Sequence, residues 1–257
     1  MPHLSRDGVK LYYEESGAGD PPIVFVHGWC CDRTYHAPQV AHFSRNHRCV
    51  TLDLRGHGRS DAPAGGYTVP AFADDVAWLC DQIGLRKPLI VGHSMGGAIA
   101  LSLAASHPDL PSAIVLLDGA VFPPAPLLAM ATALNPAFHS PAYADALAAV
   151  FDQMFMPTDD PGRKAAIMAG ARSVPQHVVA GEWDAIWSND WAGDAAACAL
   201  PIMYVGSHAP VADMTRLREA MPSAILAQTA GAGHFHQLEV PEQVNAMIDR
   251  FLAVNRQ

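Results

Sequence analysis

A short stretch in the first half of the chain, Leu89–Ala100, limits most strongly what this sequence can fold into. Its residues are typical of a buried strand as far as Gly92, one serine follows at position 94, and an Ala-rich, helix-like run begins almost at once. Glycines stand two residues before and two residues after Ser94, so the strand and helix backbones can cross without side-chain collisions. The stretch predicts a tight turn that presents the Ser94 hydroxyl beside the free N–H groups of a helix N-terminus.

Strand-like runs alternate with helix-like segments on both sides of this turn. The runs with the apolar character of strands are residues 23–26, 49–52, 89–92, 112–117, 202–205 and 224–229. This alternation predicts an α/β fold with a mostly parallel, doubly wound sheet covered by helices on both faces. Ligands of such sheets bind at the carboxyl ends of the strands, so the residues directly after each run are the candidates for function.

Residues 121–194 differ in amino-acid composition from the rest of the chain. Prolines, methionines and alanines dominate this segment, which is typical of helical pieces and adds no further strand–helix unit. We therefore expect a core of residues 1–120 and 195–257, with residues 121–194 inserted as a helical cap. The insertion leaves the sheet at its carboxyl edge, so the cap should cover the candidate site.

The composition argues against several classes of function. The 257 residues carry a net charge of −9 without basic blocks, which is unfavourable for binding nucleic acid or an anionic membrane surface. No apolar run reaches the about 18 residues of a membrane span, and no signal peptide is evident. The five cysteines lack CxxC spacing, which favours reduced thiols over disulfides or a zinc site. We expect a cytoplasmic monomer or homodimer without a metal.

Ser94 needs a general base because a free serine hydroxyl is a weak nucleophile at neutral pH. Among 13 histidines, His234 directly follows the last predicted strand, in a Gly-rich loop that can fold back over the strand ends. His27 and His57 stand beside glycines in tight turns, which favours structural roles for them. His236 competes with His234 for the role of base. The sequence predicts that Ser94 and His234 meet above the sheet.

Four motifs in this order resemble those of the α/β-hydrolase superfamily: His27–Trp29, Asp53–Ser60, Gly92–Gly96 and Gly233–Phe235. The resemblance covers nearly the whole chain outside the cap. It implies an enzyme without a cofactor, in which Ser94 attacks an acyl carbonyl, His234 takes its proton and water then cleaves the acyl-enzyme. It also implies that the backbone N–H groups of Trp29 and Met95 form an oxyanion hole.

The acid of the triad departs from the commonest pattern of the superfamily. There a carboxylate usually follows the strand that here is residues 202–205, but Gly206–Pro210 contains no acid. Asp118, at the end of the preceding strand, is expected to orient the histidine, and Asp213, at the start of a predicted helix, is the alternative. An acid at the earlier strand resembles zearalenone-type lactonases and cofactor-free quinolone dioxygenases of the same superfamily.

The cap gives hints about the substrate. Trp183, Trp187 and Trp191 recur every four residues, so they are expected on one helix face, where they either pack on the core or wall a pocket. We expect Cys30, Trp183 and Trp187 in the substrate pocket, and the small charge of the cap suggests an uncharged or apolar acyl group. The prediction is a serine hydrolase that cleaves a small-molecule carboxylic ester or lactone. A cofactor-free dioxygenase using the His/Asp pair as base and a weakly catalytic ligand sensor remain as alternatives.

Overall fold

The computed structural model describes residues 3–255, whose strands form one eight-stranded sheet. The strands are β1 (His3–Arg6), β2 (Val9–Ser16), β3 (Ile23–Val26), β4 (Cys49–Asp53), β5 (Leu89–His93), β6 (Ala113–Leu117), β7 (Ile202–Gly206) and β8 (Ile225–Gln228). Their order is β1-β2-β4-β3-β5-β6-β7-β8. Strands β3 to β8 run parallel, and β2 is antiparallel to both β1 and β4. The predicted α/β fold with a mostly parallel sheet is confirmed.

The central strands are buried on both faces, as their continuous apolar runs predict. Every residue of β3, β4, β5, β6 and β7 is buried. Successive side chains of β3 point to opposite faces, so Val24 and Val26 join one core and Ile23 and Phe25 join the other. The sheet therefore separates two apolar layers, and each layer needs helices to cover it.

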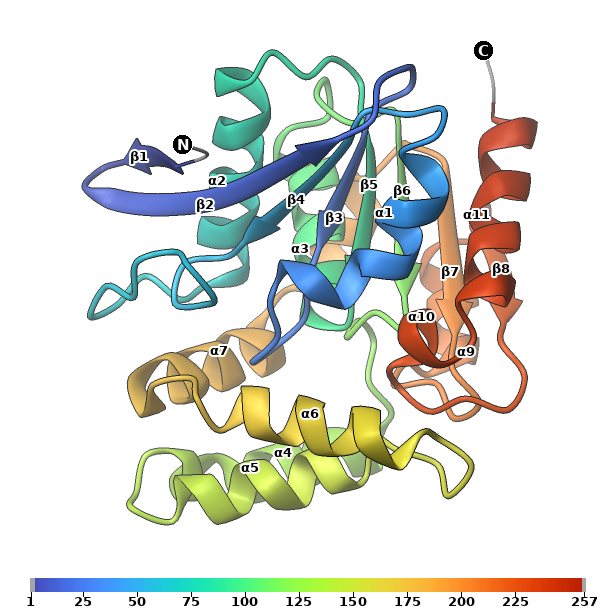
Figure 1. Cartoon of the computed structure of the whole chain (residues 1–257). Coiled ribbons are helices and arrows are strands. Elements are labelled where there is room, and N and C mark those ends of the chain that lie inside the picture. Colours follow the sequence, from blue (N-terminus) through green and yellow to red (C-terminus); the bar gives the residue numbers. More distant parts are fainter. Residues whose placement is uncertain (1–2, 256–257) are drawn as a thin grey trace.

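Helices cover both faces of the sheet (Figure 1). One face carries α1 (Ala37–Phe43) and α11 (Pro241–Val254), which contribute Phe43, Val244, Ile248 and Phe251 to its core. The other face carries α2 (Val69–Gln82), α3 (Met95–Ser106) and α8 (Trp191–Ala197). The shorter helices are η1 (Arg33–His36), α9 (Met214–Ala220) and α10 (His236–Glu239). No helix between residues 3 and 255 combines the length and apolar character that crossing a membrane requires.

Four helices between β6 and β7 lie together as a layer at the bottom of Figure 1, and we call them the cap. They are α4 (Ala125–Phe138), α5 (Tyr143–Asp152), α6 (Pro161–Ala171) and α7 (Gln176–Ser188). The cap falls inside the predicted insertion 121–194. The next helix, α8, begins at Trp191 and packs against α3, so the expected boundary after residue 194 cuts a helix that lies on the core.

The three tryptophans expected on one helix face belong to two helices. Trp183 and Trp187 lie on α7, which ends at Ser188. Asp190 then begins α8 by accepting a hydrogen bond from the backbone N–H of Gly193 over 3.0 Å. The expectation is therefore wrong for Trp191, because α7 ends at Ser188 and the side chain of Asp190 caps a new helix.

Candidate active site

Ser94 stands at the turn between β5 and α3, with a φ of 55° that non-glycine residues rarely adopt. A Cβ at Gly92 would collide with the backbone oxygen of Gly96, and a Cβ at Gly96 would collide with that of Val26. Both positions therefore require glycine for the strand and the helix to approach. Within the described residues, the Ser94 hydroxyl makes no hydrogen bond to another side chain, so it is available to a reactant.

His234 and Asp118 form a buried pair beyond the ends of β8 and β6. Nδ1–H of His234 donates to Oδ2 of Asp118 over 2.7 Å. The other carboxylate oxygen accepts from the Tyr204 hydroxyl (3.3 Å) and from the backbone N–H groups of Ser207 (3.3 Å) and Val211 (3.2 Å). Burial raises the pKa of the Asp118 carboxyl, but the hydrogen bond and charge of His234 outweigh it, so this pKa lies below its ordinary value. The carboxylate is ionised and accepts hydrogen bonds at both oxygens.

The peptide group of His234 is held at both of its polar atoms. Its carbonyl oxygen lies 2.9 Å from Nε2 of His93, the residue before Ser94. Its N–H donates to the carbonyl oxygen of Met154 over 2.8 Å, in the segment between α5 and α6. One bond ties the histidine to the turn that carries the serine, and the other ties it to the cap.

Two backbone N–H groups are unpaired beside Ser94. Trp29 follows β3, and Met95 is the first residue of α3. Neither N–H has an acceptor among residues 3–255. A Cβ at Gly28 would lie 2.9 Å from the Cβ of Ser94, so the loop after β3 runs directly past the serine. Paired donors of this kind next to a reacting hydroxyl can stabilise a developing oxyanion.

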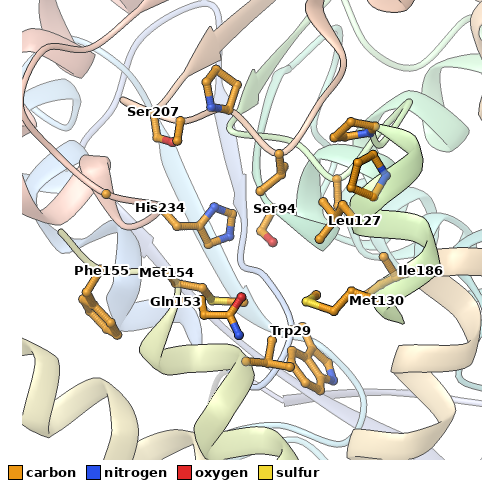
Figure 2. Close-up of a pocket in the computed structure, with 18 of the residues that line it drawn as sticks. Trp29, Ser94, Leu127, Met130, Gln153, Met154, Phe155, Ile186, Ser207 and His234 are labelled. Atoms are coloured by element: carbon orange, nitrogen blue, oxygen red, sulfur yellow. The ribbon is translucent and has the colours of Figure 1, made fainter. Parts of the chain in front are cut away.

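A cavity of about 520 Å³ opens beside Ser94 and His234, between the strand ends and the cap. Figure 2 shows these two side chains next to each other, with Met130, Gln153 and Met154 contributed by the cap region. Most of the lining is apolar, and the lining residues with a hydroxyl, amide or imidazole group are Ser94, Gln153, Ser207 and His234. None of the described residues that line the cavity is Asp, Glu, Lys or Arg.

Trp183 and Trp187 line this cavity, whereas Cys30 does not. Cys30 lines a separate cavity of about 240 Å³, which corrects its expected place in the substrate pocket. Its φ of 54° shows that the chain turns sharply directly after Trp29. Burial, reinforced by the charge of Glu182, raises the pKa of the Cys30 thiol well above its ordinary value, which makes it a poor nucleophile. All five cysteines are free thiols.

Asp213 is the N-cap of α9 and makes no hydrogen bond to His234. Its Oδ1 accepts from the backbone N–H groups of Thr215 (3.0 Å) and Arg216 (3.1 Å). The alternative acid is therefore engaged in starting a helix, and the structure brings only Asp118, of these two acids, to the histidine.

His27 and His236 have structural contacts outside the cavity. Nε2 of His27 accepts from the backbone N–H of Leu54 (3.0 Å), so its Nδ1–H donates to the Gly28 carbonyl (2.8 Å) and braces the loop beside Ser94. Nδ1 of His236 lies 3.0 Å from the Thr229 hydroxyl, and burial lowers the pKa of His236 to about 4. His236 is fully buried and does not line the cavity.

A second buried pair joins the core to the cap. Nε2 of His57 and Oε2 of Glu182 on α7 lie 3.2 Å apart, both side chains are fully buried, and they meet as an ion pair without hydrogen-bond alignment. Burial alone would lower the pKa of His57, but the charge of Glu182 raises it above its ordinary value. Burial raises the pKa of Glu182. The sequence does not indicate this pair, because the two residues are far apart in the chain and Glu182 belongs to no motif.

No group of three or more His, Cys, Asp or Glu side chains is placed to bind a metal ion in the part of the chain that the structure describes. Gln153 and Ser207 also line the cavity, although neither was among the site residues predicted from the sequence. Ser207 lies directly after β7, where the commonest superfamily pattern has its acid, and its backbone N–H donates to Asp118. Gln153 lies in a cap loop without a recognisable motif.

Comparison with known proteins extends these observations. A family model described as the alpha/beta hydrolase fold matches residues 21–160. A bifunctional esterase/perhydrolase of Acinetobacter calcoaceticus is 34% identical over 134 residues, which are 51% of this chain and 47% of the relative. A non-heme chloroperoxidase of Streptomyces lividans is 36% identical over 117 residues, 44% of this chain and 42% of the relative. The chain therefore matches somewhat under half the length of these curated relatives.

Solved structures match over nearly the whole chain. An N-acyl homoserine lactone degrading enzyme superposes with a TM-score of 0.85 at 26% identity, covering 97% of this chain and 100% of that chain. An enol-lactonase from Burkholderia xenovorans superposes with a TM-score of 0.84 at 25% identity, covering 98% and 100%. Together with the eight-stranded sheet, the strand–Ser–helix turn and the family match, these similarities establish that the chain belongs to the α/β-hydrolase family.

Proposed function

We propose that this chain is a serine hydrolase that cleaves a carboxylic ester or lactone through an acyl-enzyme intermediate. The observation that carries the proposal is the buried His234–Asp118 pair, whose imidazole borders the same cavity as the strained Ser94. The similarity to an esterase/perhydrolase, to an N-acyl homoserine lactone degrading enzyme and to an enol-lactonase supports hydrolysis of an acyl–oxygen bond.

In the first half-reaction Ser94 is the nucleophile and His234 the general base. Because Asp118 accepts the Nδ1–H, Nε2 carries the lone pair and can take the proton from Ser94 Oγ as this oxygen attacks the carbonyl carbon. The negative charge that develops on the carbonyl oxygen is stabilised by the N–H groups of Trp29 and Met95. His234 then gives the proton to the leaving alkoxide, and the acyl group remains on Ser94.

In the second half-reaction a water molecule takes the place of the alcohol. His234 removes a proton from the water as its oxygen attacks the acyl carbonyl, and the same oxyanion site holds the second tetrahedral intermediate. His234 returns the proton to Ser94 Oγ as the acid product leaves. Asp118 stays ionised throughout, because its pKa is held below the ordinary value by His234.

The lining of the cavity supports a neutral, mainly apolar substrate. A charged substrate would lose its hydration without gaining an ionic partner from the described residues of the lining. The volume of about 520 Å³ falls in the usual range for small-molecule sites. Met130, Met154 and Met156 line the cavity and can adapt to different acyl groups.

Replacing the serine tests this proposal. Ser94→Ala should lower kcat for p-nitrophenyl butyrate and for a panel of lactones by about 10⁴-fold or more, with an unchanged circular dichroism spectrum. A fluorophosphonate should label the wild type on Ser94 in peptide mass spectrometry and leave Ser94→Ala unlabelled. Ser106→Ala is the matched control, because Ser106 bonds to a carbonyl within α3 and lies outside the cavity.

Retained turnover in Ser94→Ala would contradict the acyl-enzyme mechanism. If that variant consumed oxygen with a hydroxylated heteroaromatic compound, a cofactor-free dioxygenase using the His234–Asp118 pair would replace the proposal. Tight binding without turnover across the whole ester and lactone panel would favour a ligand sensor.

A further inference from the structure

The segment between α5 and α6, Met154–Asp159, lies against the loop that carries His234, and we call it the tether segment. Its first residue, Met154, accepts the N–H of His234 through its carbonyl oxygen over 2.8 Å. The N–H of the preceding residue, Gly233, donates to Oδ1 of Asp159 over 3.3 Å. The tether segment of the cap therefore accepts hydrogen bonds from two successive peptide N–H groups, those of Gly233 and His234. We call the loop after β8 that carries these two residues the histidine loop, and Figure 2 shows Met154 beside His234.

Asp159 organises both sides of this contact. The residue is 9% exposed, although a lone aspartate in a surface loop is usually solvated. Oδ2 accepts from the backbone N–H of Met156 over 2.8 Å, which closes the tether segment on itself, and Oδ1 accepts from Gly233. Both partners of the Asp159 side chain are N–H donors, so a carboxylate with two acceptor oxygens suits the position. The amide of an asparagine has one acceptor oxygen and could accept only one of the two hydrogen bonds.

The histidine loop is shaped to receive the tether segment. A Cβ at Gly233 would lie 2.6 Å from Oδ2 of Asp159 and 2.5 Å from the carbonyl oxygen of Met154. Both neighbours are polar atoms already engaged in hydrogen bonds, and one is backbone, so they cannot move aside cheaply. A glycine on the core and a buried carboxylate on the cap thus make one close contact.

Neighbouring contacts hold the two segments together. The rings of Phe155 and Phe235 stack with their centroids 5.2 Å apart. Glu239, at the end of α10, accepts from the backbone N–H of Asp160 over 3.2 Å and pairs with Arg163 of α6 at 2.5 Å. The histidine loop is consequently bound to the cap on one side and, through the His93–His234 bond, to the serine turn on the other.

We propose that Asp159 is a positioning residue for His234, so that the cap helps to set the general base as well as to enclose the substrate. This inference rests on the proposed function. The bond to Asp118 orients the imidazole, but the distance of Nε2 from Ser94 also depends on where the His234 peptide lies. A misplacement of a catalytic group by about 1 Å can slow a reaction about 100-fold, so loosening the tether segment should slow proton transfer.

Substitutions on both sides of the contact test the proposal. Asp159→Ala should lower kcat about tenfold with KM within about twofold, and Asp159→Asn, which keeps one acceptor oxygen, should lose about threefold. Gly233→Ala should resemble Asp159→Ala, and the variant that combines both should be no slower than the slower single variant, because they disrupt one interaction. Asp160→Ala is the control, because its side chain caps α6 and does not touch the histidine loop.

The downfield proton NMR signal of the His234–Asp118 hydrogen bond gives a readout independent of turnover. It should be present in the wild type, in Ser94→Ala and in Asp160→Ala, and should shift or broaden in Asp159→Asn. Wild-type kcat and an unshifted signal in Asp159→Ala or Asp159→Asn would overturn the positioning role while Ser94→Ala remained inactive. Active Ser94→Ala would instead overturn the proposed function, whatever the Asp159 variants do.

Discussion

Asp118 reaches a set of donors that belongs to the neighbouring strand. Superfamily members with the commoner pattern carry their acid after the strand equivalent to β7, and here that segment begins with Ser207. The Ser207 N–H and the Tyr204 hydroxyl of β7 both donate to the Asp118 carboxylate, which extends to them from the end of β6. The Asp118 carboxylate therefore lies next to the end of β7, although the residue itself follows β6.

Replacing Asp118 and Asp213 in turn by asparagine tests which of them is the acid that orients His234. Asp118→Asn should lower kcat by about 10²- to 10⁴-fold, because an amide does not stabilise the imidazolium and disturbs the tautomer of His234. Asp213→Asn should change kcat by less than about twofold, because asparagine is also a good N-cap. Steady-state kinetics with one p-nitrophenyl ester measures both. A larger loss in Asp213→Asn would reverse the assignment of the acid.

Trp29 connects the loop after β3 to the cap through its side chain. Its indole Nε1 donates to the carbonyl oxygen of Val179 on α7 over 3.1 Å. Its ring packs against Phe138 at 5.4 Å and Trp183 at 5.0 Å between centroids. The side chain of Trp29 is therefore bound to the cap, while its backbone N–H faces the proposed oxyanion. The cap thus stabilises the loop after β3 as well as the loop that carries His234.

Two substitutions at Trp29 should separate the contribution of ring packing to the free energy of unfolding from that of the indole hydrogen bond. Trp29→Phe keeps most of the buried ring and loses one hydrogen bond, so it should lower the free energy of unfolding by about 1 kcal/mol. Trp29→Ala leaves a cavity between core and cap and should cost about 3–5 kcal/mol. Urea denaturation measures both values. Equal losses in the two variants would mean that the indole N–H, and not the ring, holds the loop.

The sequence predicted the elements whose signals are local. The glycines around Ser94 predict the strand–Ser–helix turn, and the apolar runs predict the parallel strands, because both patterns depend on neighbouring residues alone. The edge strand β1 was missed, because four residues, three of them half-buried and one exposed, carry little pattern. The break between α7 and α8 was missed because the period of the tryptophans continues across Asp190, whose capping role depends on its local conformation.

The candidate site could be predicted where its residues follow strands. His234 and Asp118 both lie at the carboxyl edge of the sheet, so topology brings them together, although 116 positions separate them. Asp159 and Glu182 could not be found in this way. Their partners, Gly233 and His57, are brought to them only by the docking of the cap, which depends on packing across the whole interface.

At the scale of the whole molecule, the buried contact between His57 and Glu182 predicts that the stability of the folded protein depends on pH. The pKa of His57 is raised by Glu182, so the stability that this pair contributes is fully present below the ordinary histidine value and is lost as pH rises through the raised one. The raised pKa of Glu182 acts in the same direction, since the folded chain binds this proton more tightly than the unfolded chain and the linked stability is also lost as pH rises.

Thermal unfolding of Glu182→Gln across pH should reveal this dependence. At pH 6 the variant should be less stable than the wild type by about 3 kcal/mol, and the difference should shrink as pH rises to 9. Asp184→Asn on the same helix is the matched control, because its exposed pair with His139 should contribute less than about 1 kcal/mol. A difference that grows with pH would contradict the assigned direction of the His57 pKa.

The aromatic lining of the cavity gives the protein an internal optical probe. Three of the five tryptophans, Trp29, Trp183 and Trp187, line the cavity of Ser94. Their emission depends on the polarity around the indole rings, and a bound molecule displaces water from the same space. Quenching or a spectral shift in the inactive Ser94→Ala variant would therefore rank candidate compounds by affinity, without a chromogenic leaving group and before any turnover is known.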